Sequence, residues 1–584
     1  MFNTLSEQQK KVVFEKSGKF VVRACPGSGK TYSVAARLAH RIENWKYKRK
    51  GIAALSFTNA AWKEIELQLK KSFNLSNTIQ YPDFLGTLDS FINQHIFLPF
   101  GHLIMECQKR PVLVGEPHGS WNYCPYERCY EQYFDIVSYN IDDSLVYPEF
   151  QQAFFFGYSK IFKRNGTESQ HAANLRKIKQ EFWQKGYANQ SDANYFAVKI
   201  LEKYPHIAKA LVARFPKFII DEAQDTTEVQ MRLIDILIEN GLDEVMLIGD
   251  ADQAIFEWNN AKPELFNQKF NAWKDNSFEL SENRRSSQKI CDFTVRLTSM
   301  PSPATAIDVD VKDYHLTPEI VSYDHQNTNS IQEVVSSFVR KCKENEIETN
   351  PEKVSVLVRG GSFIDMVLGN QSSGRPENPW VAGDAITRDM ARAKFLIDNN
   401  HYKEGYKQLE KAFVKAVLKK RQCLKEDIQA RIDDLGFIQH RKEIYGIASL
   451  LPSTKDMNID AWVIDANRAL NDKGIKLNIK KNGSILVRRL FQKESHILTS
   501  DEYRLGTVHS VKGETFDAVL LLLKTAGADS KTYRKLLAGG VKTKDNEELR
   551  IVYVAMTRPR KFLMIAVPNN CAESWYNFFD NFPV

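Results

Sequence analysis

One glycine-rich segment near the amino terminus constrains the fold more than any other part of the chain. Residues 19–31 read Lys-Phe-Val-Val-Arg-Ala-Cys-Pro-Gly-Ser-Gly-Lys-Thr. The β-rich run at 20–22 leads into a glycine-rich turn, and Val34, Leu38 and Ile42 follow at helical spacing. Strand, loop and helix in this order are the setting of a phosphate-binding loop, so the segment predicts an α/β fold that binds a nucleotide.

The residue types in this loop fit phosphate chemistry. Gly27 and Gly29 let backbone N–H groups approach the phosphates. Lys30 is long enough to reach the β- and γ-phosphates, and the Thr31 hydroxyl suits Mg²⁺. The general pattern asks for another glycine at position 24, where this chain has alanine. We expect the nucleotide to lie against one continuous stretch: Ala24, Cys25, Pro26, Gly27, Ser28, Gly29, Lys30 and Thr31.

A second segment supplies the acidic residues that such a site needs. Residues 217–225 read Lys-Phe-Ile-Ile-Asp-Glu-Ala-Gln-Asp, and the apolar run at 218–220 has the composition of a buried parallel strand. Asp221 then falls at the carboxyl end of that strand, where open α/β sheets bind ligands, and it suits Mg²⁺ binding. Glu222 suits a base that orients the attacking water.

These two segments together resemble superfamily 1 DNA helicases of the UvrD, Rep and PcrA type. The resemblance extends along the chain, because further motifs of that family follow in family order from residue 5 to residue 558. These further motifs are the segments 5–9, 55–61, 86–91, 248–258, 280–286, 507–513 and 553–558.

The resemblance implies an enzyme, an ATP hydrolase and DNA helicase that moves 3′-to-5′ on single-stranded DNA with ATP and Mg²⁺. It places Mg²⁺ on Thr31 and Asp221. It assigns catalysis, with two arginine fingers, to Lys30, Glu222, Gln253, Arg285 and Arg558. The residues that it places on DNA are Phe57, Thr58, Asn59, Thr87, Trp258, Arg359 and His509. For the Phe57 and Trp258 rings, packing inside the protein is the alternative to stacking on bases.

The end of the site that would hold adenine departs from the family pattern. Gln9 matches the glutamine that reads the base, but Tyr32 and Arg284 stand where the family often has arginine and tyrosine. We expect a clamp of reversed composition, because a guanidinium and an aromatic ring both stack on a purine. The alternative is that Tyr32 packs beside its helix and Arg284 faces solvent. Glu514 stands one position earlier than the family's acidic residue, so its contact with the nucleotide stays open.

The resemblance also implies an architecture. The expected fold is α/β, with two RecA-like P-loop motor lobes, each a parallel sheet flanked by helices and interrupted by a mostly helical insertion. The expected order is first lobe (1–96), its insertion (97–205), first lobe (206–283), second lobe (284–385), its insertion (386–496) and second lobe (497–584). Apolar runs predict second-lobe strands at 320–323, 354–358, 518–523 and 563–567, and residues 402–432 look helical.

Residues 83–100 have a closer resemblance, to the helicase subunit of the bacterial Gabija anti-phage system. It implies an antiviral defence role beside an ABC-ATPase/Toprim nuclease of the OLD family. The expected DNA substrates are single strands and 3′-tailed duplexes. Two alternatives stay open: a free-standing DNA repair helicase, and a DNA-end-sensing ATPase that regulates a partner nuclease without strong unwinding.

Composition restricts the remaining classes. Of the 584 residues, 43% are hydrophobic and 26% charged, which excludes a wholly disordered or fibrous chain. The longest apolar run, 518–523, is too short to span a bilayer, and the start lacks a secretory signal. We therefore expect a cytoplasmic protein with no membrane partner. Five residues within 28 positions are either ordinary reduced side chains or metal ligands: His102, Cys107, His118, Cys124 and Cys129.

Overall fold

The structure is a computed structural model, and the chain divides into two compact units. The first contains Met1–Leu113, Val137–Gln371 and Ile497–Val584, and the second includes Ser372–His496. The segment boundaries predicted from the sequence are a finer division and stay a prediction. The residues described are 2–75, 79–114, 137–146, 163–164, 167–168, 170–255, 260–360, 363–367, 379–381, 385–419, 423, 425–480, 485–491, 497–524 and 529–580.

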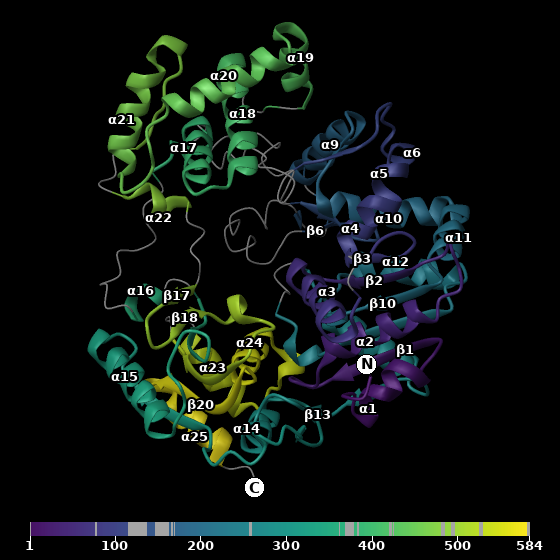
Figure 1. Cartoon of the computed structure of the whole chain (residues 1–584), viewed down its shortest axis with the longest axis vertical. Coiled ribbons are helices and arrows are strands. Elements are labelled where there is room, and N and C mark those ends of the chain that lie inside the picture. Colours follow the sequence, from purple (N-terminus) through teal and green to yellow (C-terminus); the bar gives the residue numbers. More distant parts are fainter. Residues whose placement is uncertain are drawn as a thin grey trace. The chain divides into compact units, whose positions relative to one another are not determined.

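The first unit contains a six-stranded sheet in which all strands run parallel (Figure 1). Its order is β12 (Phe278–Leu280), β1 (Lys19–Ala24), β11 (Glu244–Gly249), β10 (Lys217–Ile220), β2 (Ile52–Ser56) and β3 (Phe84–Thr87). The strands predicted at 20–22 and 218–220 are confirmed as β1 and β10. Parallel neighbours need crossover connections, and helices supply them: α2 (Lys30–Glu43), α3 (Asn59–Phe73) and α12 (Glu228–Glu239).

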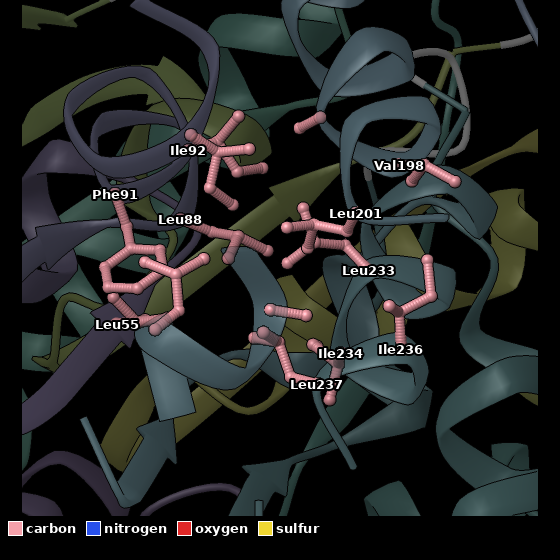
Figure 2. Packing of buried hydrophobic residues seen from close by; sticks show 14 of the residues in the cluster. Leu55, Leu88, Phe91, Ile92, Val198, Leu201, Leu233, Ile234, Ile236 and Leu237 are labelled. Carbon is pink, nitrogen blue, oxygen red and sulfur yellow. The ribbon is translucent and has the colours of Figure 1, made fainter. Parts of the chain in front are cut away.

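This first sheet is buried on both faces because its side chains alternate between two hydrophobic cores. In β1, Phe20 and Val22 pack into one core, with residues of α2 and α3, and Val21 packs into the other. Figure 2 shows the second core, in which strand and helix side chains meet: Leu55, Leu88, Phe91, Ile92, Val198, Leu201, Leu233, Ile234, Ile236 and Leu237. With both faces covered, polar groups gather at the carboxyl ends of the strands.

A second six-stranded sheet lies in the same unit and is parallel except for its edge strand β17. Its order is β15 (Glu319–Tyr323), β20 (Pro559–Pro568), β19 (Phe516–Leu522), β16 (Val354–Val358), β18 (Arg504–Thr507) and β17 (Ile497–Thr499). The four strands predicted for the second lobe are confirmed as β15, β16, β19 and β20. The long apolar run at 518–523 forms β19, whose side chains fill cores on both faces of the sheet.

Further helices and turns of the first unit surround the two sheets. The helices among them are α1 (Glu7–Lys10), α4 (Leu88–Ile92), α14 (Gln288–Thr294), α15 (Thr328–Glu344), α24 (Glu547–Met556) and α25 (Ala572–Asp580). Three single turns of 3₁₀ helix are η5 (Ala251–Gln253), η10 (Val508–Val511) and η11 (Thr543–Asp545).

The described part of the second unit is helical. Its helices are α17 (Ala385–Asp398), α18 (Tyr402–Leu418), α19 (Lys425–Leu435), α20 (Phe437–Leu450), α21 (Ile459–Leu470) and α22 (Val487–Phe491) (Figure 1). The helical interpretation of residues 402–432 is confirmed by α18 and α19. Helix α18 approaches α17 closely at Gly405, where a Cβ would lie 2.7 Å from Ile397 Cγ1. Within the described residues, no helix has the length and apolar character to cross a membrane.

Candidate functional site

The phosphate loop joins β1 to α2. Gly27 and Gly29 have φ angles of 73° and 75°, and Gly29 precedes the helix that begins at Lys30. A Cβ at Gly29 would lie 2.7 Å from Gln9 Nε2, and one at Gly27 would lie 2.6 Å from Asn283 Oδ1. Only glycine fits both positions. The loop backbone thus stays open beside the amino end of α2, an arrangement that binds phosphate.

Asp221 follows β10 and lies beside the loop threonine. Its backbone N–H donates to Leu55 O at 2.8 Å, and its Oδ1 accepts from the Glu222 N–H at 2.9 Å. Thr31 Oγ1 donates to Asp221 Oδ2 at 3.4 Å. Burial, together with the Glu222 carboxylate, raises the pKa of Asp221 to about 7. A hydroxyl and a buried carboxylate are hard oxygen ligands, so Thr31 and Asp221 fit Mg²⁺, whose charge would favour the ionised carboxylate.

Glu222 faces the loop lysine. Its Oε2 lies 3.9 Å from Lys30 Nζ and accepts a 2.5 Å hydrogen bond from Gln224 Nε2. Burial opposes the charge of Glu222, but Lys30 and Lys512 outweigh burial and lower its pKa to about 2. Its φ of 52° and ψ of 40° are left-handed, a conformation sparsely populated by residues with a Cβ. Because of its low pKa, the Glu222 carboxylate is ionised at neutral pH.

Two arginines from outside the first sheet complete this arrangement. Arg558 follows α24, is 1% exposed, and donates from Nη2 to Gln253 Oε1 at 2.6 Å. Gln253 Nε2 in turn donates to Asp250 Oδ2 at 2.5 Å. Arg285 Nη1 donates to Thr557 O at 3.1 Å. Burial, and then the charge of Arg558, lower the pKa of Arg285 well below its usual value. We call Lys30, Asp221, Glu222, Arg285 and Arg558, together with the neutral Gln253 that accepts from Arg558, the charged cluster.

Three further charged side chains meet this cluster, and sequence reasoning did not single them out. Lys512 Nζ donates to Asp225 Oδ2 at 2.6 Å, and burial raises the pKa of Asp225 to about 6. Burial also raises the pKa of Asp250 to about 6. Each lies inside a segment already identified as a motif, so a charged residue within a motif was the signal that could have found them.

At the expected adenine end, the structure places Gln9 against the phosphate loop. Gln9 is buried, and its Nε2 donates to Ser28 O at 3.2 Å. Tyr32 shares a 2.7 Å hydrogen bond with the Thr4 hydroxyl, and its ring centroid lies 5.3 Å from that of Phe73. The Tyr32 ring is thus partly packed within the protein, and its stacking on a base stays a prediction.

Arg284 and Glu514 have different environments. The Arg284 N–H donates to Gly27 O at 2.8 Å, which ties its backbone to the loop. Among the described residues, the buried Arg284 Nε has no hydrogen-bond partner, and the stacking of this guanidinium on a base stays a prediction. Glu514 instead accepts two hydrogen bonds from Arg504, at 2.5 and 3.0 Å, and its contact with the nucleotide stays a prediction.

The residues expected to touch DNA near the first sheet lie at the carboxyl ends of β2 and β3. Thr58 and Thr87 are the N-caps of α3 and α4, and each hydroxyl accepts from a backbone N–H, at 3.2 and 3.0 Å. Phe57 is half-buried and Asn59 is exposed. Trp258 lies outside the described residues. β2 and β3 are neighbours in the sheet, so Thr58 and Thr87 share one edge.

Two more expected DNA contacts lie at the corresponding edge of the second sheet. Arg359 follows β16, and His509 lies in η10 after β18, the neighbouring strand. Arg359 Nε donates to both oxygens of Glu548, at 3.0 and 2.8 Å. Burial, and then the charge of Arg359, lower the pKa of His509 to about 4. The imidazole is therefore neutral at pH 7 and can donate or accept a hydrogen bond.

The possible metal cluster is only partly described. His118, Cys124 and Cys129 lie outside the described residues. Cys107 is buried and its Sγ donates to Lys109 O at 3.2 Å. In the part of the chain that the structure describes, no three His, Cys, Asp or Glu side chains are grouped to hold a metal ion.

Comparison with protein families gives two matches. Residues 5–106 and 127–274 match the UvrD/REP helicase N-terminal domain, and residues 387–570 match the UvrD-like helicase C-terminal domain. The first match contains the phosphate loop, Asp221, Glu222 and Gln253, and the second contains Arg558. Arg285 lies between the two matched regions.

Similar proteins include helicases and components of helicase/nuclease enzymes. The putative ATP-dependent DNA helicase YjcD of Bacillus subtilis is 23% identical over 625 residues, which is 97% of this chain and 79% of that protein. An ATP-dependent helicase/nuclease subunit of Streptococcus pneumoniae is 34% identical over 109 residues, 18% of this chain and 9% of that protein. Its counterpart in Streptococcus equi subsp. zooepidemicus is 30% identical over 185 residues, which is 31% of this chain and 14% of that protein. The chain thus matches only a small part of these two streptococcal proteins.

Proposed function

The chain belongs to the UvrD-like helicase family, and we propose that it is an ATP-dependent DNA helicase that moves 3′-to-5′ along single-stranded DNA. The two six-stranded sheets would be its RecA-like motor lobes. The observation that carries the proposal is that two arginines, Arg285 and Arg558, lie near each other in the charged cluster. Arg558 is buried and Arg285 is half-buried, and burial lowers the pKa of each guanidinium group. A γ-phosphoryl between the sheets would supply the negative charge that these two groups need.

Each member of the charged cluster would then have one task in ATP hydrolysis. Lys30 would bind the β- and γ-phosphates, and Mg²⁺ on Thr31 and Asp221 would neutralise charge on them. Glu222, held ionised by Lys30, would accept a hydrogen bond from the attacking water and orient it. Gln253 already contacts Arg558, so it would report the state of the γ-phosphate to the second sheet.

DNA would cross the carboxyl edges of both sheets. Phe57 and Trp258 would stack on bases, while Thr58, Asn59, Thr87, Arg359 and His509 would contact the strand; stacking tolerates any base sequence. Approach and separation of the sheets would move the strand stepwise. Residues 385–491 carry 22 Lys and Arg against 13 Asp and Glu, which is a net charge of +9 for this segment. The whole chain of 584 residues has a net charge of +8. That excess of positive charge supports duplex binding by the second unit.

Strand displacement tests the proposal directly. We expect ATP-dependent release of the shorter strand from a 3′-tailed duplex and none from the matched 5′-tailed duplex. Lys30→Ala is the control that should remove release from the 3′-tailed duplex. Release from the 5′-tailed substrate alone would overturn the polarity. DNA-stimulated hydrolysis without any release would favour the second candidate, an ATPase that senses DNA ends for a partner nuclease.

We also propose a nuclease partner. Two of the relatives are named as subunits of helicase/nuclease enzymes, which supports a shared task with a nuclease. The resemblance of residues 83–100 supports an OLD-family ABC-ATPase/Toprim nuclease as the partner and anti-phage defence as the setting. Co-expression with such a neighbouring gene should give a complex that survives gel filtration. Lys30→Ala should abolish defence but leave the complex intact. A monomer with unchanged defence would contradict this assignment.

A further inference from the structure

The turn that carries Gln253 is held at two separate places by residues in and beside helix α24. The turn is η5, which directly follows β11 of the first sheet. At one place Gln253 accepts from Arg558, which follows the carboxyl end of α24. At the other, Asp252 Oδ1 accepts from Thr543 Oγ1, and the carbonyl next after the turn, Ala254 O, accepts from Arg550 Nε at 2.7 Å. Thr543 lies in η11, just before α24, and Arg550 lies within α24.

The second place is buried and tightly constrained. Arg550 is 1% exposed and Thr543 is fully buried. Besides Ala254 O, the Arg550 guanidinium donates to Thr543 O at 2.8 Å and Lys544 O at 3.4 Å. Burial raises the pKa of Asp252, whereas Thr543, Arg23 and Arg550 act to lower it. The planar Arg550 guanidinium is fixed on several carbonyls, and the half-buried Asp252 carboxylate beside it accepts from Thr543, so the contacts tolerate little displacement.

We propose that Thr543, Arg550 and Asp252 are positioning residues that set the register between Gln253 and Arg558. Their contacts, from here on the α24 latch, act through the turn and not on the phosphates. With the latch closed, η5 and α24 are held as one body, so the Gln253 carboxamide stays within 2.6 Å of the Arg558 guanidinium. This inference rests on the proposed ATPase function, in which that pair reports the γ-phosphate to the second sheet.

Two variants at position 543 test the latch. Thr543→Val keeps the shape of the side chain but removes the donor to Asp252, whereas Thr543→Ser keeps the donor. We expect Thr543→Val to lower kcat for DNA-stimulated ATP hydrolysis by about tenfold with KM for ATP unchanged, and Thr543→Ser to restore kcat. A general loss of structure would instead change KM and kcat together and lower the melting temperature of the variant.

A second background separates positioning from other effects. In Gln253→Ala the pair that the latch positions is already gone, so adding Thr543→Val should lower kcat no further. An additional tenfold loss in that background would overturn the inference. So would a Thr543→Val variant with parental kcat.

A readout without catalysis keeps the test independent of the proposed function. Amide hydrogen exchange in residues 251–255 should become at least several-fold faster in Thr543→Val, with exchange in α12 unchanged. Faster exchange without any ATPase activity in the parent would refute the proposed function and leave the latch standing. Unchanged exchange at 251–255 would refute the latch, whatever the activity.

Discussion

Replacing Asp221 by asparagine should make the ligand-free protein more stable. Burial and the neighbouring Glu222 carboxylate raise the pKa of Asp221 from 3.8 to about 7. The folded state therefore holds this proton more tightly than the unfolded state does. The stabilisation that comes from this tighter proton binding is fully present below pH 4 and is lost as the pH rises through 7.

The size of the effect follows from the shift. One pKa unit corresponds to 1.36 kcal/mol, so an increase from 3.8 to about 7 removes about 4 kcal/mol from the free energy of unfolding at pH 8. Asp221→Asn removes the charge but keeps the contacts. The amide oxygen can still accept from the Glu222 N–H, and the amide nitrogen can donate to the Thr31 hydroxyl. We expect the variant to regain most of that free energy at pH 8.

Calorimetric melting of the ligand-free protein between pH 5 and pH 8 measures this. The melting temperature of Asp221→Asn should exceed that of the parent by an amount that grows with pH. Asp434→Asn, at an exposed position, is the matched control and should change nothing. A variant that melts below the parent at pH 8, or a gain that is the same at both ends of the range, would refute the reasoning.

Three other outcomes can be checked by simple assays. Lys30→Ala and Glu222→Gln should each abolish ATP hydrolysis in a phosphate-release assay but keep single-strand affinity, because neither side chain is expected to touch DNA. Phe57→Ala should weaken single-strand binding by about 1–3 kcal/mol in a fluorescence titration; unchanged affinity would mean that the ring only packs. Tyr32→Ala and Arg284→Ala should each raise KM for ATP, and together by less than the product of the two effects. Unaltered KM in both single variants would exclude the clamp.

The sequence predicted those parts of the fold that local pattern encodes. The run at 20–22 and the apolar segment at 218–220 become β1 and β10, because a strand buried on both faces needs consecutive apolar residues. The same reasoning found β19 from 518–523. Residues 402–432, interpreted from the sequence as helical, contain α18 and most of α19, because apolar residues recur at helical spacing in both segments.

Contacts between distant segments could not be predicted in this way. Gln253 and Arg558 are 305 positions apart, and no propensity or spacing indicates that their side chains meet at 2.6 Å. The contacts of Arg550 with the turn after β11 had no signal of their own, because one arginine in a helix usually faces solvent. Tyr32 shows a different limit: its place after the loop is readable, but its packing against Phe73 depends on tertiary structure.

The glycine at position 27 has a neighbour besides any phosphate. Its carbonyl accepts from the Arg284 N–H, and a Cβ there would lie 2.6 Å from Asn283 Oδ1 and 2.7 Å from Arg285 Cβ. Those three residues belong to the stretch through which the chain leaves the first sheet for the second. A methyl group at position 27 would therefore push against Asn283 and Arg285, in the segment that connects the two sheets, even with no nucleotide bound. Glycine at position 27 is therefore required by the packing of the segment that connects the two sheets, as well as by phosphate binding.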